Sequence, residues 1–246
     1  MNGFVPTERS KLRRLYQRGA YDHAAVFAIL DASLFCHIGY VIDGQPYVTP
    51  TGYWREGDRL YWHGSSASRM LRSQSAGIPV CFSVMIVDGL VLARSGFHHS
   101  VNYRSVMAFG RAAKIEDGAE KERALEAYVD RFLPGRNREL RPIDSQELKA
   151  TTVLGLTIEE ASAKVRTGPP VDDEPDYSLP VWAGVVPIRQ VFSTPIADPR
   201  LAPGTPIPAH IAALAPGTDF TEAMRQLAEQ AQAGGYAASE AAPAAP

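Results

Sequence analysis

Short turn signals between apolar runs constrain the fold of this chain more than any other feature of its sequence. Asp-Gly pairs occupy residues 43–44 and 88–89, and Glu-Gly-Asp occupies residues 56–58. An Asp-Gly pair between apolar runs favours a β-hairpin, because a type I′ turn needs positive φ at both central residues. Successive hairpins predict an antiparallel meander, and closing a meander into a barrel removes its free edges.

The apolar runs around these turns predict the strands. Residues 34–42 (LFCHIGYVI) are apolar almost throughout, which favours a buried strand. Further strands are predicted at residues 47–54, 59–64, 79–87, 90–96, 105–116 and 151–166. Helices are expected to begin near Asp22, Asp117, Ser145 and Thr221, where capping residues or an amphipathic pattern occur. The predicted fold class is therefore mainly β with peripheral helices (α+β).

Changes in composition divide the chain into three parts. Residues 1–21 form a basic arm, which we expect to lie on the domain or on a partner subunit; a solvated basic surface is an equally open interpretation. Residues 22–197 form the predicted domain. Residues 198–246 shift to Ala and Pro, and we expect one helix there, followed by a low-complexity tail.

Charge and cysteine content narrow the classes of function. The 25 Lys and Arg residues nearly balance 27 Asp and Glu, and a net charge of -2 gives no drive towards nucleic acid or an anionic membrane. Cys36 and Cys81 lie in apolar runs and make no disulfide framework. The N-terminus lacks an apolar leader and no apolar run reaches membrane-spanning length, so we expect a cytoplasmic protein.

The stretch HGSSASRMLRSQSAG at residues 63–77 carries the clearest chemical pattern. A strand ends at His63, and a helix is expected to begin near Ser66. Free backbone N–H groups at a helix start attract anions, and two arginines three residues apart lie on one helix face. The alternative is a solvated short helix that Ser66 caps. The candidate phosphate ligands are Ser65, Ser66, Arg69 and Arg72.

Two further polar stretches are candidates for ligand contact. Residues 95–106 gather polar side chains that either contact a ligand or face solvent in a hairpin loop. The adjacent His98 and His99 lack a third ligand, and with no C-x-x-C or H-E-x-x-H motif we predict no metal site. Within residues 47–54, Pro50 cannot donate to a sheet ladder and marks either an edge or a break in the strand; such an edge either hydrogen-bonds a ligand or stays bare.

Four motifs in order resemble one known superfamily. They are GQPYVTP at residues 44–50, LYWHGSSASRMLR at 60–72, NYRSVMAFGRA at 102–112 and WAGVVP at 182–187. Together they resemble the pyridoxamine-5′-phosphate-oxidase-like proteins, within the branch that contains nitroimidazole-resistance and flavin-nucleotide-binding proteins. The resemblance covers roughly residues 10–190 and does not reach the Ala/Pro-rich tail.

The resemblance implies an antiparallel split β-barrel homodimer with two FMN molecules at the subunit interface. It places the phosphate at the strand-to-helix stretch and the isoalloxazine ring along the strand that contains Pro50. Trp182 is expected either to pack on the flavin of the partner subunit or to serve as a core or interface aromatic. The implied FMN ligands are Val48, Thr49, Pro50, Thr51, His63, Gly64, Ser65, Ser66, Arg69, Arg72, Tyr103, Arg104, Ser105 and Trp182.

The expected function is that of an FMN-dependent oxidoreductase acting on a small-molecule substrate. His63 or His99 would donate a proton, since imidazole titrates near neutrality. The alternatives are a flavin carrier or sensor without turnover, a heme-binding protein with His98 or His99 as ligand, and a deazaflavin-binding protein. The basic substrate-phosphate residues of true pyridoxamine-phosphate oxidases are not found, so vitamin B6 oxidation is not expected.

Overall fold

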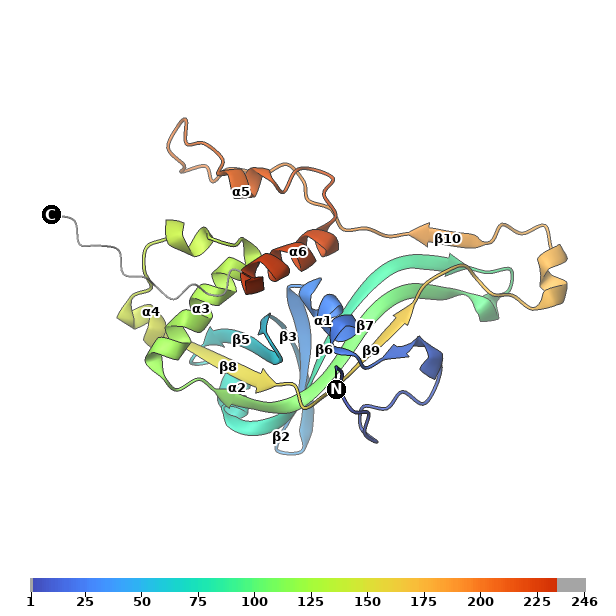
Figure 1. The fold of residues 1–246 in the computed structure, drawn as a ribbon, viewed down its shortest axis with the longest axis horizontal. Coiled ribbons are helices and arrows are strands. Elements are labelled where there is room, and N and C mark those ends of the chain that lie inside the picture. Colours follow the sequence, from blue (N-terminus) through green and yellow to red (C-terminus); the bar gives the residue numbers. More distant parts are fainter. Residues whose placement is uncertain (1, 234–246) are drawn as a thin grey trace.

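The computed structural model describes residues 2–233 and is built around one ten-stranded, mainly antiparallel sheet with helices packed against it (Figure 1). The main path of the sheet runs β3-β2-β6-β7-β8-β5-β4. Its strands are β1 (Gly19–Ala20), β2 (Phe35–Ile42), β3 (Gln45–Gly52), β4 (Trp54–Glu56), β5 (Arg59–Ser65), β6 (Ala76–Leu92), β7 (Ser100–Lys114), β8 (Thr151–Thr157), β9 (Glu160–Arg166) and β10 (Gly184–Pro187). The predicted fold class is confirmed.

The first predicted hairpin is confirmed, and the one at residues 88–89 is wrong. Asp43 and Gly44 have φ of 50° and 78°, as a type I′ turn between β2 and β3 requires. By contrast, β6 continues through residues 88–89, where the pairing with β7 shifts register after Val87. The chain reverses only at residues 93–99. Gly89 lies at a bulge here instead of a turn, and β10 pairs with β6 close to its backbone.

Large apolar side chains fill the interior of the sheet. Ile38, Phe82 and Leu154 are fully buried there, on three strands of the barrel. Trp62 is also fully buried, and its indole N–H donates to the Gln74 side-chain oxygen at 3.0 Å. This bond satisfies the indole N–H in the core and ties β5 to α2.

The described residues form six α-helices, of which α5 lies on a segment away from the sheet (Figure 1). They are α1 (His23–Asp31), α2 (Arg69–Gln74), α3 (Gly118–Phe132), α4 (Ser145–Ala150), α5 (Ala209–Ala212) and α6 (Phe220–Ala233). The predicted caps Asp22 and Asp117 each accept a hydrogen bond from the first turn. The cap of α4 is Asp144 and not Ser145, because its carboxylate accepts two backbone N–H groups and Glu147 completes a capping box.

The N-terminal arm lies on the domain itself, one of the placements left open by the sequence. β1 pairs with β9, and the Arg9 guanidinium contacts the Glu160 carboxylate on that strand. At the other end, α6 packs against α1 and α3, where Arg131 donates to the Met224 carbonyl oxygen at 3.0 Å. The predicted tail from residue 234 lies outside the described residues.

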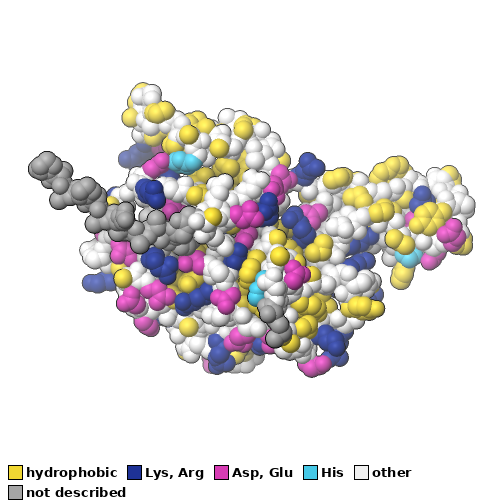
Figure 2. Space-filling view, in the orientation of Figure 1, with side chains coloured by type: hydrophobic (Ala, Val, Ile, Leu, Met, Phe, Trp, Pro, Cys, Tyr) yellow, Lys and Arg dark blue, Asp and Glu magenta, His cyan; other side chains and the backbone are white. Residues whose placement is uncertain are grey.

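The β6–β7 hairpin projects from the barrel as an arm, with β10 along one side of it (Figure 1). Many hydrophobic side chains are exposed along this arm in the space-filling view (Figure 2). They include Leu90, Phe97, Val101, Val181, Trp182 and Val186. None of the helices in residues 2–233 combines the length and the apolar composition needed to span a membrane.

Candidate functional site

The strand that carries the predicted ring contacts lies at an edge of the sheet. In the described part of the chain β3 pairs only with β2, so its second edge is free, as Pro50 predicted. Val48 is 68% exposed and Pro50 is also exposed on the outer face. Thr49 points to the other face, with its hydroxyl 3.1 Å from that of Tyr40. A planar ligand can therefore lie against Val48 and Pro50.

The predicted phosphate stretch follows β5, but its helix starts later than expected. α2 begins at Arg69, and the Ser68 hydroxyl caps it by accepting from the Leu71 N–H. The Ser66 N–H is not free for an anion, because it donates to the Ala150 carbonyl at 2.7 Å. Ser65 and Ser66 are exposed and present hydroxyl groups beside Gly64 at the end of the strand.

The two arginines of this helix have different surroundings. The Arg69 guanidinium lies over the Tyr47 ring on β3, 4.5 Å from its centroid. Arg72 lines a separate hollow with Lys114 and Lys149. Arg69 is therefore the arginine placed beside β3, over the face that carries Tyr47.

His63 is held beneath α3. Its ring packs edge-on against Tyr128, at a centroid distance of 4.3 Å, and beside Trp54. The Nδ1 atom is buried and has no hydrogen-bond partner in the described residues. Burial lowers the pKa of His63 below its ordinary value, because the imidazolium loses solvation. The buried position therefore favours the neutral imidazole over the imidazolium.

The other predicted histidines lie at the far end of the β6–β7 arm. His99 follows the short turn Gly96–His98, and its Nδ1 lies 2.8 Å from the Ser95 carbonyl oxygen. His98 pairs with Asp173 at 3.3 Å. A single chain therefore does not bring His99 and His63, on β5, together (Figure 1).

The predicted β7 residues take different positions. Arg104 forms a bidentate ion pair with Asp88, at 2.7 and 2.9 Å. The Ser105 hydroxyl donates to the Lys164 carbonyl at 3.2 Å, which fixes it to β9. Tyr103 is half-buried. Trp182, which precedes β10, is 67% exposed and is therefore not a core residue of this chain.

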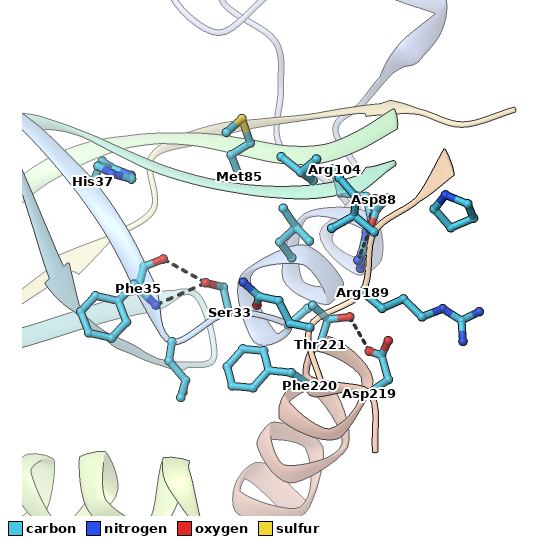
Figure 3. Close-up of a pocket in the computed structure, with 17 residues that line it drawn as sticks. Ser33, Phe35, His37, Met85, Asp88, Arg104, Arg189, Asp219, Phe220 and Thr221 are labelled. Atoms are coloured by element: carbon cyan, nitrogen blue, oxygen red, sulfur yellow. Dashed lines mark hydrogen bonds and ion pairs between the residues drawn. The ribbon is translucent and has the colours of Figure 1, made fainter. Parts of the chain in front are cut away.

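A cavity of about 680 Å³ lies on the outer face of β2, β6 and β7 (Figure 3). Its other wall consists of residues 187–190 and the start of α6. Phe35, His37 and Met85 project from the sheet into it, and the Arg104–Asp88 pair lies at its other end. The register pairs His37 with Pro50. The cavity thus adjoins the strand predicted to hold the flavin ring.

His37 was not among the ligand-contact residues predicted from the sequence. The prediction that residues 34–42 form a buried strand is wrong for one face, since Phe35, His37 and Val41 are exposed. The spacing of two residues between Phe35 and His37 could have indicated this, because it places both side chains on one face of a strand. An apolar run can be buried by a ligand or a second subunit as well as by the domain's own core.

A sequence profile of the pyridoxamine 5′-phosphate oxidases matches residues 22–165. The chain belongs to the pyridoxamine 5′-phosphate oxidase family. This match confirms the resemblance stated from the four motifs. No curated protein compared with the chain matches it.

Solved structures extend the comparison. The flavocytochrome Anf3 from Azotobacter vinelandii is 47% identical, with a TM-score of 0.81 over 85% of this chain and 98% of that chain. The FAD and heme binding protein from Mycobacterium smegmatis is 36% identical, with a TM-score of 0.79 over 82% of this chain and 98% of that chain. A 5-nitroimidazole antibiotic resistance protein from Bacteroides thetaiotaomicron shares 22% identity, with a TM-score of 0.48 over 60% of this chain and 86% of that chain.

Proposed function

We propose that this chain is a flavin-binding oxidoreductase of small molecules. The observation that carries the proposal is the free edge of β3 beside Arg69. An exposed apolar strip at Val48 and Pro50 suits a planar ring. The Arg69 guanidinium, which lies over Tyr47 on the opposite face of the same strand, suits a phosphate placed at the free edge. Two family members of high identity are named as a flavocytochrome and as an FAD and heme binding protein.

The residues fit the FMN half that all flavin nucleotides share. Arg69 and the hydroxyls of Ser65 and Ser66 would hold the inner phosphate. Backbone groups on the free edge of β3 would hydrogen-bond the ring near Thr49–Thr51 and stabilise negative charge on it. When bound, a flavin supplies hydride or electron transfer, while the protein contributes placement and electrostatics.

The protein would work as a homodimer. Phe35, Met85 and Met107 lie on the same outer face as Val48, and all four are exposed in one chain. An exposed apolar face across four neighbouring strands is typical of a surface that a partner covers. Sedimentation analysis should give twice the chain mass; a monomer at micromolar concentration would contradict this part of the proposal.

Arg69→Ala provides the test of the flavin site. Loss of a hydrogen bond to a charged group should weaken flavin binding by about 1.5–3 kcal/mol. Apo-protein is titrated with FMN and followed by flavin fluorescence. Arg200→Ala, which removes an exposed arginine in the loop after β10, is the matched control. Unchanged affinity in Arg69→Ala would remove this arginine from the site.

Turnover separates an oxidoreductase from a flavin carrier or sensor. Anaerobic mixing with a nicotinamide cofactor, followed by a panel of electron acceptors, should bleach and then restore the flavin bands. A protein that binds flavin and never turns over is a carrier. A deazaflavin is distinguished by its own absorbance and by mass spectrometry of the released cofactor.

A second candidate function is heme binding, favoured by the cavity on the outer face of the sheet. Its apolar walls suit a porphyrin, and His37 is an exposed imidazole beside Phe35 and Met85 (Figure 3). His98 and His99 are less suited, because each already contacts an oxygen atom. Heme titration should produce a Soret band that His37→Ala shifts or abolishes. A band unchanged in His37→Ala but lost in His99→Ala would restore the arm histidines as ligands.

A further inference from the structure

One side chain from a helix reaches the strip of β3 on which the proposed flavin ring lies. The outer face of β3 is exposed at Val48 and Pro50, and Gly52 follows them on the same face, because successive residues of a strand alternate. This face is covered at Gly52, where an added Cβ would lie 3.2 Å from the Tyr128 hydroxyl oxygen. Tyr128, on α3, therefore places a phenol at the end of the apolar strip.

The rings of three neighbours hold the Tyr128 side chain in place. His63 contacts it edge-on at a centroid distance of 4.3 Å, Phe132 does so at 4.8 Å, and Trp54 lies 5.2 Å away. These neighbours come from β5, α3 and β4, so the phenol is held from three elements. Such packing fixes the direction of a polar group before a ligand arrives, and less side-chain freedom is then lost on binding.

The hydroxyl at the end of this ring is available to a ligand. It makes no hydrogen bond within residues 2–233, and its oxygen is not enclosed, in contrast to Nδ1 of His63. Burial of the ring raises the pKa of Tyr128, because the phenolate loses solvation. The hydroxyl therefore keeps its proton at neutral pH and remains a hydrogen-bond donor.

The place of Tyr128 along β3 agrees with the direction in which a flavin would lie. Arg69 lies over Tyr47 near the start of the strand, whereas the Tyr128 hydroxyl meets the strand at Gly52, five residues further on. At about 3.3 Å per residue, these two positions are about 16 Å apart along the strand. A flavin with its phosphate at the free edge beside Arg69 would extend its ring towards Tyr128.

We propose that Tyr128 donates a hydrogen bond from its hydroxyl to the flavin ring, at an atom that gains negative charge on reduction. This inference rests on the proposed flavin site and adds a helical residue to it. A hydrogen bond to a charged acceptor is stronger than one to a neutral acceptor. Tyr128 therefore stabilises the reduced form of the bound flavin more than the oxidised form and raises its reduction potential.

The test is the two-electron reduction potential of FMN bound to four full-length proteins: wild type, Tyr128→Phe, Tyr61→Phe and Arg69→Gln. Anaerobic reduction in the presence of a reference dye gives each potential from the visible spectrum. Tyr128→Phe should weaken binding of reduced FMN about tenfold more than binding of oxidised FMN. For a two-electron couple, this ratio lowers the potential of the bound flavin by about 30 mV.

Tyr61→Phe is the matched control. It removes a phenol oxygen from the same aromatic cluster, where Tyr61 stacks on Trp54 at 5.4 Å and lies beneath the Arg59 guanidinium. Its potential should equal that of wild type. Arg69→Gln should weaken binding of oxidised and reduced FMN by similar factors, because the phosphate does not change charge on reduction, and its potential should also equal that of wild type.

The outcomes separate this inference from the function on which it rests. A wild-type potential in Tyr128→Phe overturns the inference and leaves the flavin site intact. An equal fall in Tyr61→Phe and Tyr128→Phe also overturns it, because the effect would then belong to the aromatic cluster as a whole. If the wild-type protein binds no FMN, the proposed function fails and the inference fails with it.

Discussion

Replacing Asp31 should destabilise this protein more than replacing any surface carboxylate. Asp31 is the last residue of α1, where the helix dipole disfavours an anion. Arg55 on β4 compensates, since its Nε donates to Asp31 Oδ1 at 2.9 Å and its Nη2 contacts the second oxygen. The side chains are only 8% and 6% exposed, respectively. The same guanidinium lies 4.1 Å from the Phe27 ring centroid and donates to Gln232 at 3.1 Å.

The magnitude follows from what each variant leaves behind. Asp31→Ala leaves the Arg55 guanidinium buried without its carboxylate partner, which lowers the free energy of unfolding by about 3–5 kcal/mol. Asp31→Asn keeps the shape and one acceptor, so about 1–3 kcal/mol is expected. Asp31→Leu/Arg55→Met removes both charges and should be less destabilised than the sum of its single variants, because the two residues are in contact.

Urea unfolding followed by tryptophan fluorescence measures these losses. With a slope of about 2 kcal/mol per molar urea, Asp31→Ala should lower the midpoint by about 1.5–2.5 M. Asp117→Ala, which removes an exposed helix cap, is the control and should cost only about 1 kcal/mol. A midpoint for Asp31→Ala equal to that of Asp117→Ala would refute the account of a buried, mutually dependent pair.

Two more predictions concern single buried groups. Since burial lowers the pKa of His63, the unfolded chain binds the proton more tightly than the folded chain does. The free energy of unfolding should therefore fall as the pH drops below about 6.5 and stay constant above it. The His63→Phe variant should lack this pH dependence, and a pH slope identical to that of wild type would contradict the account. Burial raises the pKa of both thiols, but Cys36 is fully buried and donates to the Thr51 carbonyl at 3.5 Å, so iodoacetamide should modify Cys81 first. Peptide mapping checks this order, and equal rates at the two sites would count against it.

Much of this fold could be predicted from short stretches of the sequence that specify turns, helix caps and edge strands. Asp43 and Gly44 form a hairpin turn because both residues adopt the positive φ that a type I′ turn requires, and this requirement is local. Asp117 caps α3 and Pro50 lies on an edge strand for similarly local reasons. Such features depend on a few neighbouring residues, which a sequence displays directly.

The features that escaped prediction depend on distant parts of the chain. The start of α2 was displaced because the Ser66 N–H is taken by Ala150, more than eighty residues further along. Arg69 and Arg72 share one helix face and still have different neighbours: Arg69 lies over Tyr47 of β3, whereas Arg72 lines a hollow that includes residues of β8. His37 faces a cavity whose far wall is formed by residues 187–190 and α6, which no local pattern near β2 could indicate.

The close packing of β10 on Gly89 can be tested by substitution. A Cβ on Gly89 would lie 2.9 Å from the Val186 carbonyl oxygen and 3.1 Å from the Val185 side chain. Gly89→Ala should therefore push β10 away from β6. The barrel core should keep its stability, because β10 pairs only with the projecting arm in the described residues.

Limited proteolysis of Gly89→Ala should cut within residues 180–196 faster than in wild type, with a urea midpoint close to that of wild type. Gly96→Ala is the matched control, since nothing lies within 4 Å of an added Cβ at that position on the same arm. If Gly89 served a hairpin turn, Gly89→Ala would instead disturb the pairing of β6 with β7 and lower the midpoint. Cleavage at the wild-type rate would show that close packing of β10 is not what requires glycine at this bulge.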